Sequence, residues 1–263
     1  MPGGETGAET RNTIGDITMI LTIAIQKGGT GKTTTAAAIA QAAVYHGKNV
    51  LAIDLDPQGQ LSFTLAADTN KPGSYELING TAAADLIQHI TDGLDVIPAN
   101  WDLSTITSYR GSARRLQTAL EPIKKEYDLI IIDTPPTAGE LQYNALQAAD
   151  KLIIPLQADI YNLQSLYQIT DAARQIQASN KGLEIAGVVL TQYDGRSTLV
   201  KQMRETITEQ AAAMGIPFLG AIRAAVAVKE AAALQKSLFD YAPKSKPAAD
   251  YLALYNAITK REE

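Results

Sequence analysis

The sequence predicts an α/β fold, a doubly wound and mostly parallel sheet with helices on both faces. Short apolar, β-branched runs alternate with longer stretches of helical composition along almost the whole chain. Runs that are apolar throughout are typical of parallel strands covered on both faces. A glycine-rich segment follows the first run, and acidic residues end two later runs. These features predict a ligand site at the carboxyl edge of the sheet, where such folds bind ligands.

The first strand is expected at residues 20–25 and the first helix at about 32–46, because Gly47 is a usual residue after a helix. The other predicted strands are residues 50–54, 94–98, 129–133, 151–155, 185–190 and 217–222. The other predicted helices are residues 80–90, 111–126, 139–149, 162–179, 197–214 and 247–260. Tyr161 and Tyr167, at one of these helices, are interpreted as packing residues.

We expect one domain over residues 19–263, because no linker and no internal repeat interrupts this order. Residues 1–18 contain glycines and acids but lack the apolar segment of a signal peptide. They are therefore expected to lie outside the fold, either as a disordered extension or because the start of the chain is wrongly assigned.

The composition excludes several classes of site. The chain has no cysteine, which excludes disulfides, thiolate metal sites and thiol nucleophiles. No apolar stretch approaches 18 residues, so no membrane-spanning helix is predicted. The net charge of −5 argues mildly against nucleic-acid binding. Residues 196–246, however, contain eight basic and four acidic residues, a net +4, which leaves −9 elsewhere. A local basic face and a scattered, solvated surface are both compatible with this distribution.

The most informative segment is residues 26–34, Gln-Lys-Gly-Gly-Thr-Gly-Lys-Thr-Thr. Glycines let successive backbone N–H groups turn toward one anion, and the N-terminus of the following helix adds partial positive charge. Lys32 would reach the β- and γ-phosphates of a nucleotide, and the Thr33 hydroxyl would bind Mg²⁺. The other residues of this loop expected to contact the nucleotide are Gly28, Gly29, Thr30, Gly31 and Thr34. The common P-loop pattern has a glycine where this chain has Gln26, and Lys27 is a second lysine.

Acidic motifs follow two of the predicted strands. Asp54 and Asp56 belong to Asp-Leu-Asp-Pro-Gln-Gly after the second strand, and Asp133 ends the isoleucine-rich strand 129–133. The carboxyl ends of parallel strands meet at one edge, so one crevice can hold both motifs and the glycine loop. Magnesium takes few protein ligands. We therefore expect Thr33 to bind it directly, Asp133 to bind it through a water, and Asp54 to lie behind the Thr33 region.

Together these segments resemble the ParA/MinD group of P-loop ATPases, and within it the ParA/Soj-type DNA-partitioning ATPases. The resemblance extends over nearly the whole chain from Met19, through residues 27–34 (the deviant Walker A motif), 54–59, 144–156 and 190–196. It implies a P-loop NTPase fold of the SIMIBI type that hydrolyses ATP slowly with Mg²⁺. It also implies an ATP-dependent homodimer in which Lys27 reaches the partner's phosphates. In the resemblance Asp133 is the Walker B carboxylate, Asp56 orients the attacking water, and Gln192 lies near the adenine.

The same resemblance implies non-specific DNA as a partner, a ParB-like protein that stimulates hydrolysis, and a cytoplasmic, nucleoid-associated location. The resemblance places a DNA-contacting arginine at Arg196. The local basic charge adds the other residues of the expected DNA-binding face, Lys201, Arg223, Lys229 and Lys236. Two departures from the family pattern stand out. The proline before Arg223 is missing, and the second arginine after it is replaced by Val226 or Ala227. In addition, no helix-turn-helix precedes the glycine loop.

Two other functions remain open from the sequence. A MinD-like ATPase that positions itself on membranes needs a basic amphipathic C-terminal helix. Residues 251–263 end in two glutamates, which disfavours that function and predicts no membrane partner. A relative that positions a cargo other than DNA would have the same motifs, so the sequence does not separate it from a DNA-partitioning ATPase.

Overall fold

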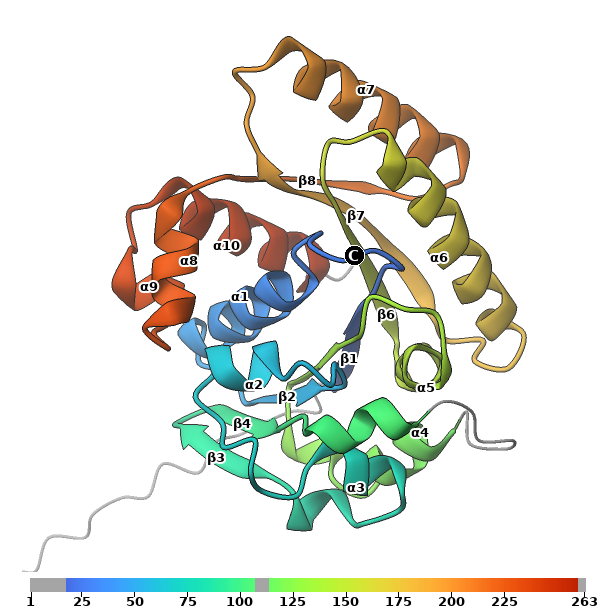
Figure 1. The fold of residues 1–263 in the computed structure, drawn as a ribbon, viewed down its shortest axis with the longest axis vertical. Helices are drawn as coiled ribbons and strands as arrows, with labels where there is room; N and C mark the ends of the chain where they lie inside the picture. The colour runs from blue at the N-terminus through green and yellow to red at the C-terminus, as the bar shows by residue number, and fades with distance from the viewer. Residues whose placement is uncertain (1–17, 107–113, 260–263) are drawn as a thin grey trace, which may run out of the picture.

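The computed structural model describes residues 18–106 and 114–259, which contain one eight-stranded sheet of order β3-β4-β2-β5-β1-β6-β7-β8 (Figure 1). The strands are β1 (Met19–Ile23), β2 (Val50–Asp54), β3 (Gln88–Thr91), β4 (Leu94–Ile97), β5 (Leu129–Asp133), β6 (Lys151–Leu156), β7 (Glu184–Tyr193) and β8 (Phe218–Arg223). Neighbouring strands are parallel except for β3 and β4, which are antiparallel. The predicted mostly parallel sheet is therefore confirmed.

Helices cover both faces of this sheet, as predicted. They are α1 (Lys32–Tyr45), α2 (Gln60–Thr64), α3 (Ser74–Ile78), α4 (Arg115–Leu120), α5 (Glu140–Ala148), α6 (Tyr161–Gln177), α7 (Thr198–Ala213), α8 (Val226–Ala233), α9 (Leu238–Tyr241) and α10 (Lys246–Thr259). Short 3₁₀ turns are η1 (Ala83–Asp85), η2 (Trp101–Thr105) and η3 (Lys124–Glu126). Helices α1 and α10 pack on one face, and α5, α6 and α7 pack on the other (Figure 1).

The apolar runs of the central strands supply both sides of the core. Side chains alternate between the two faces of a strand. Leu21 and Ile131 therefore join the cluster that includes α1 and α10. Their neighbours Ile20 and Ile130 join the cluster on the opposite face, beside α3, α4 and α5. Because helices exclude water from both faces of the sheet, the central strands are apolar along their whole length.

The predicted helix over residues 80–90 is wrong. The structure has only the 3₁₀ turn η1 there, followed by strand β3, whose side chains alternate between half-buried and exposed. Asp92 and Gly93 connect β3 to its antiparallel partner β4, and Gly93 has a φ of 82°. Asp-Gly is a strong signal for a two-residue hairpin, because the turn needs positive φ. This local signal outweighs the helical composition of the preceding alanines.

The predicted helix over residues 111–126 is shorter in the structure. Residues 111–113 lie outside the described residues, and regular helix is present only in α4 (Arg115–Leu120). Pro122 follows two residues later, and proline cannot continue a helix because it lacks an N–H and clashes with the preceding turn. The short helices α2, α3, α8 and α9 were not predicted, since four to eight residues give too few turns for a periodic pattern.

The predicted disordered extension, residues 1–18, lies outside the described residues except for Thr18. The Thr18 hydroxyl lies 2.6 Å from the carbonyl of Lys124 and 2.8 Å from that of Tyr127. The ordered fold therefore includes Thr18, one residue before the predicted start.

Candidate nucleotide-binding site

The register of the sheet brings the predicted motifs to one place. Asp133, the last residue of β5, is paired with Ile23 of β1 on one side and with Asp54 of β2 on the other. The glycine loop follows β1, so it leaves the sheet at the same edge as the two carboxylates. Strand order thus creates the crevice in which α/β folds bind ligands.

The glycine loop has the backbone of an anion cradle. Gly29 and Gly31 have φ values of 74° and 85°, in the left-handed region that favours glycine. Gly31 is also close to Thr191, because a Cβ atom on Gly31 would lie 3.3 Å from the threonine side chain. Helix α1 begins at Lys32, directly after the loop, with its N-terminus toward the crevice. The helix N-terminus and the loop N–H groups together favour bound phosphate.

Lys32 lies inside this cradle and is only 6% exposed. Its ammonium group donates to the backbone carbonyl of Lys27 over 3.0 Å. Burial lowers the pKa of Lys32, while the charges of Asp133 and Asp56 oppose this effect. A bound phosphate could replace the Lys27 carbonyl as the hydrogen-bond acceptor of this buried ammonium group.

Thr33 and Asp133 bring two oxygen-bearing side chains together, and oxygen is the ligand type that Mg²⁺ prefers. The Thr33 hydroxyl donates to the Asp133 carboxylate over 2.6 Å. Burial raises the pKa of Asp133, the charge of Asp54 raises it further, and the hydrogen bond from Thr33 lowers it. Magnesium prefers oxygen ligands and uses one or two from the protein beside substrate phosphates and water. A divalent cation here would offset the repulsion between the two buried carboxylates.

Asp54 lies beside Asp133 in the sheet and is held by the loop that follows its own strand. Its fully buried carboxylate accepts hydrogen bonds from the Ser62 N–H and hydroxyl and from the Asp56 N–H, at 2.8, 2.7 and 3.1 Å. Burial raises its pKa to about 6, and these hydrogen bonds partly counter the rise. These hydrogen bonds tie Asp54 to the loop between β2 and α2, while its charge acts on Asp133, the partner of Thr33. Asp54 shapes the backbone that carries Asp56.

Asp56 lies beyond the end of β2, in a turn. Its side chain is half-buried, and one carboxylate oxygen accepts from the Gln58 N–H at 3.0 Å. Because the strand has ended, Asp56 is not forced to the face opposite Asp54. Its charge raises the pKa of Lys32 and so opposes the effect of burial.

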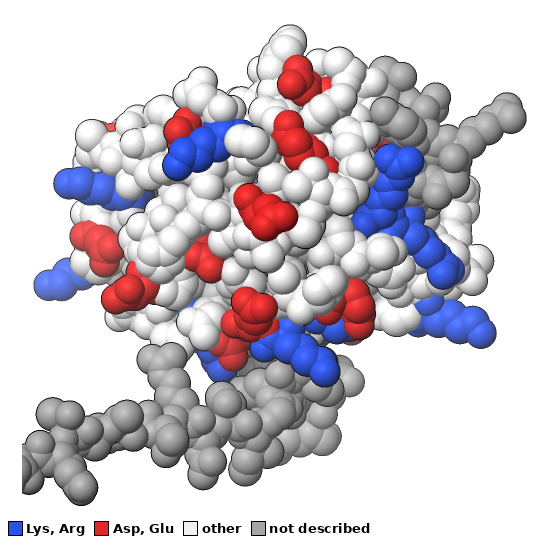
Figure 2. Space-filling model, turned by 90° about the horizontal axis from the view of Figure 1, so that it is seen from below, with Lys and Arg blue, Asp and Glu red and all other residues white. Residues whose placement is uncertain are grey.

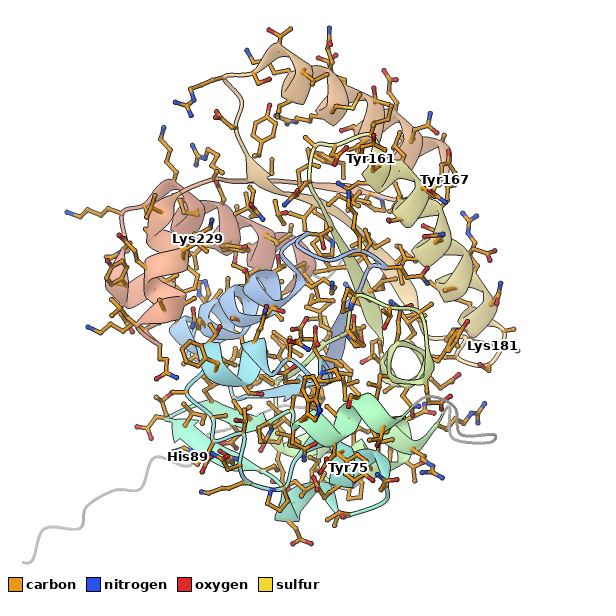
Figure 3. All side chains as sticks on the ribbon, viewed as in Figure 1. Tyr75, His89, Tyr161, Tyr167, Lys181 and Lys229 are labelled. Carbon is orange, nitrogen blue, oxygen red and sulfur yellow. The ribbon has the colours of Figure 1, made fainter. Side chains whose placement is uncertain are left out.

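Lys27 contacts residues of its own chain. Its ammonium group lies 3.4 Å from the Asp159 carboxylate and 5.9 Å from the centre of the Tyr161 ring. Tyr161 and Tyr167 were expected to be packing residues, but they are 76% and 50% exposed on α6 (Figure 3). The buried stripe of α6 is formed by residues such as Leu166 and Ile169, and both tyrosines fall outside it.

The sequence analysis missed two residues that contact the glycine loop. The Gln157 amide donates to the Gly29 carbonyl over 2.7 Å, and the Thr191 hydroxyl donates to the Thr30 carbonyl over 2.6 Å. Gln192, expected near the adenine, also donates to the Gly29 carbonyl, at 3.2 Å. All of these residues stand at or just after the carboxyl ends of β6 and β7, which is the signal that could have identified them.

Two of the basic residues expected to bind DNA, Arg196 after β7 and Arg223 at the end of β8, are paired with acids. Arg196 bonds the carboxylate of Asp194 at 2.6 Å, and Arg223 bonds that of Asp250 at 2.6 Å. Hydrogen bonding by Arg196 lowers the pKa of Asp194 to about 2. Asp194 and Asp250 lie just outside residues 196–246, so including them reduces the net charge of the group from +4 to +2.

The three lysines of the expected DNA surface are exposed. Lys201, on α7, lines a groove of about 580 Å³ together with Arg204 and the acidic Glu205 and Glu209. Lys229 lies on α8 (Figure 3), and Lys236 follows that helix. Lys236 also lines a small pocket with residues of α1 and α2, away from the groove beside Lys201.

Comparison with known proteins identifies the family. A family model described as an AAA domain matches residues 18–185. The chromosome partitioning protein ParA of Caulobacter vibrioides is 37% identical over 255 residues, which cover 92% of this chain and 94% of that protein. The sporulation initiation inhibitor protein Soj of Bacillus subtilis is 36% identical over 248 residues, 91% of this chain and 97% of that protein.

A solved structure agrees with these relatives. The cobyrinic acid a,c-diamide synthase of Mycobacterium smegmatis, with bound ADP and magnesium, superimposes with a TM-score of 0.77 at 30% identity. The match covers 89% of this chain and 91% of that one. Within residues 18–106 and 114–259, no helix is both long enough and apolar enough to cross a membrane. Because the family model and both relatives match most of its length, this chain belongs to the Soj/ParA family of P-loop ATPases.

Proposed function

We propose that this protein is a ParA-type partitioning ATPase. ATP binding would join two chains into a sandwich dimer, the dimer would bind DNA without sequence preference, and hydrolysis stimulated by a ParB-like partner would release it. The observation that carries this proposal is the crevice in which the glycine loop, Lys32 and three aspartates meet, with the second lysine, Lys27, beside it. Relatives named for chromosome partitioning support it.

Each residue of the crevice has a physical task in phosphoryl transfer, which depends mainly on positioning and on charge stabilisation. The loop N–H groups and Lys32 would hold the β- and γ-phosphates. Thr33 and Asp133 would hold Mg²⁺, whose charge offsets that of the phosphate oxygens. Asp56 would orient the attacking water, and Asp54 would keep the Asp56 turn in place through its bonds to Ser62 and to the Asp56 N–H.

Replacing Asp56 with alanine should leave ATP affinity nearly intact and slow hydrolysis by roughly 10²-fold or more, the usual effect of losing a positioning group. The ATP-bound dimer should then accumulate, as seen by sedimentation with ATP. Asp171→Ala, at an exposed position of α6, is the matched control and should hydrolyse ATP normally. Normal turnover in Asp56→Ala would transfer the role to another residue.

The proposed DNA surface must be local, because the chain as a whole is acidic. Figure 2 shows the end of the molecule away from α7, where acidic side chains spread over the centre and basic ones lie mainly toward the edges. A duplex would be repelled there. Residues around β7, β8, α7 and α8 offer a better surface, and dimerisation would bring two copies of it onto one duplex.

The ion pair of Arg196 with Asp194 gives a sharp test of this surface. Arg196→Ala should weaken ATP-dependent binding to every duplex, while Asp194→Asn should strengthen it by freeing the guanidinium from its carboxylate. Each phosphate contact contributes a slope of roughly 0.9 in log K against log salt. Arg196→Ala should therefore also flatten the salt dependence of binding. Binding of unrelated duplexes across a salt series measures both effects.

The control is Lys181→Ala, which removes one positive charge at an exposed position before the amino end of β7 (Figure 3). It should bind DNA like the unmodified protein. If no duplex binds at low salt with ATP, the proposal of a DNA cargo fails. The net charge and the paired arginines would then favour an ATPase that positions another cargo. Anionic liposomes in a parallel assay test the membrane alternative.

A further inference from the structure

Three side chains at the carboxyl ends of β6 and β7 form hydrogen bonds with backbone carbonyls of the glycine loop. We call Gln157, Thr191 and Gln192 the carbonyl clamp. Gln157 and Gln192 both donate to the Gly29 carbonyl, at 2.7 and 3.2 Å. Thr191 donates to the next carbonyl, that of Thr30, at 2.6 Å. Two consecutive carbonyls of the loop are thus bound from the side of β6 and β7.

Binding these carbonyls also sets the direction of the loop N–H groups. In a trans peptide the C=O of one residue and the N–H of the next point in opposite directions. Holding the Gly29 and Thr30 carbonyls toward β6 and β7 therefore turns the N–H groups of Thr30 and Gly31 away from the clamp. The clamp keeps these donors on the opposite side of the loop from the two strands, as an anion cradle requires.

The first part of the loop has no packing contacts that would oppose rotation of its peptides. A Cβ atom on Gly28 or Gly29 would meet no heavy atom within 4 Å, so the loop is not packed at these residues. Glycine also adopts positive and negative φ about equally well. Bonds from outside the loop therefore help to fix the orientation of its peptides.

Thr191 is held firmly by its surroundings, and Gln192 has an unusual backbone conformation. Thr191 is 3% exposed, and its hydroxyl also lies 3.3 Å from the Leu156 carbonyl of β6. Gln192 has a φ of 50°, which costs a residue other than glycine free energy. Gln192, which has this backbone conformation, is also the residue whose side-chain amide donates to the Gly29 carbonyl. Local strain at such a position is typical of functional sites.

We propose that the carbonyl clamp is a set of positioning residues for nucleotide binding. It acts through the orientation of the loop peptides and touches no phosphate itself. The inference rests on the proposed function, because it concerns the same nucleotide site. It predicts that loss of the clamp lowers the affinity for any nucleotide with a β-phosphate, while the catalytic groups Lys32 and Asp56 remain in place.

The test uses ADP, which separates binding from hydrolysis. Thr191→Val keeps the shape of the side chain and removes its donor, and Gln157→Leu removes the amide without adding charge. Each should weaken ADP binding in calorimetry about 5-fold, the equivalent of one hydrogen bond, and the double variant more strongly. Thr191→Ser keeps the hydroxyl and should restore near-normal affinity. Gln202→Leu, at an exposed position of α7, is the matched control.

Two further measurements separate positioning from a purely structural role. The melting temperature of Gln157→Leu without nucleotide should equal that of the unmodified protein, and kcat at saturating ATP should fall far less than ADP affinity. Normal ADP affinity in both Thr191→Val and Gln157→Leu would overturn the inference alone. If the unmodified protein binds no ADP, the proposed function falls together with the inference.

Discussion

Lys32→Ala should lose most of its affinity for both ATP and ADP. The ammonium group is almost fully buried in the cradle and would be the main cation facing the phosphates. Removing one partner of a buried, hydrogen-bonded charge pair costs about 2–5 kcal/mol. Since each 1.4 kcal/mol is tenfold in Kd, the loss should be roughly 30-fold to several thousand-fold. Calorimetry with ADP, and the rise in melting temperature caused by nucleotide, both measure it.

The exposed Lys181→Ala again serves as the control of equal charge, because Lys181 lies at the amino end of β7 and the glycine loop follows the carboxyl end of β1. Circular dichroism should show that Lys32→Ala is folded, since Lys32 packs at the start of α1 and not within the apolar core. Unchanged ATP affinity in a folded Lys32→Ala would refute the assignment of this loop as the phosphate cradle.

The parts of the fold that were predicted correctly depend on local signals. The strands Val50–Asp54 and Leu129–Asp133 have the predicted bounds, because each is an apolar run with polar residues at its end. Helix α1 ends one residue early, before Gly47, whose φ is 73°. The glycine loop was recognised from the same kind of signal, in which glycine, lysine and threonine stand at fixed spacing between a strand and a helix.

The parts that were missed depend on contacts between residues far apart in the chain. Gln157 and Thr191 reach the glycine loop across more than a hundred residues, and no spacing rule announces such a contact. Ser62 bonds Asp54 and also accepts from the Ala99 N–H, so it links β2, α2 and the segment after β4. A count of charges along the sequence likewise missed the ion pair of Arg223 with Asp250.

The contacts of Lys27 also change what its substitution should reveal. The sequence predicts that Lys27 acts on the partner's nucleotide, yet in the single chain its ammonium group lies 3.4 Å from Asp159. With side chains that are 29% and 40% exposed, this pair is worth little in stability. Lys27 can therefore leave Asp159 when a better anion arrives. Asp159→Asn should accordingly retain ATP-dependent dimerisation, because it removes the carboxylate and keeps the lysine.

Lys27→Ala should bind ATP almost normally and yet show no ATP-dependent dimer and almost no turnover. A cation supplied by a partner to the reacting phosphates typically accelerates hydrolysis by about 10³-fold or more. Mixing two inactive proteins tests whether the lysine acts across the dimer. In a mixed dimer of Lys27→Ala and Asp56→Ala, the nucleotide of the first chain has its own Asp56 and receives Lys27 from the second. Turnover should therefore reappear on mixing and be absent from either protein alone. A mixture that stays inactive, or normal dimerisation and turnover in Lys27→Ala, would reduce Lys27 to a surface charge paired with Asp159.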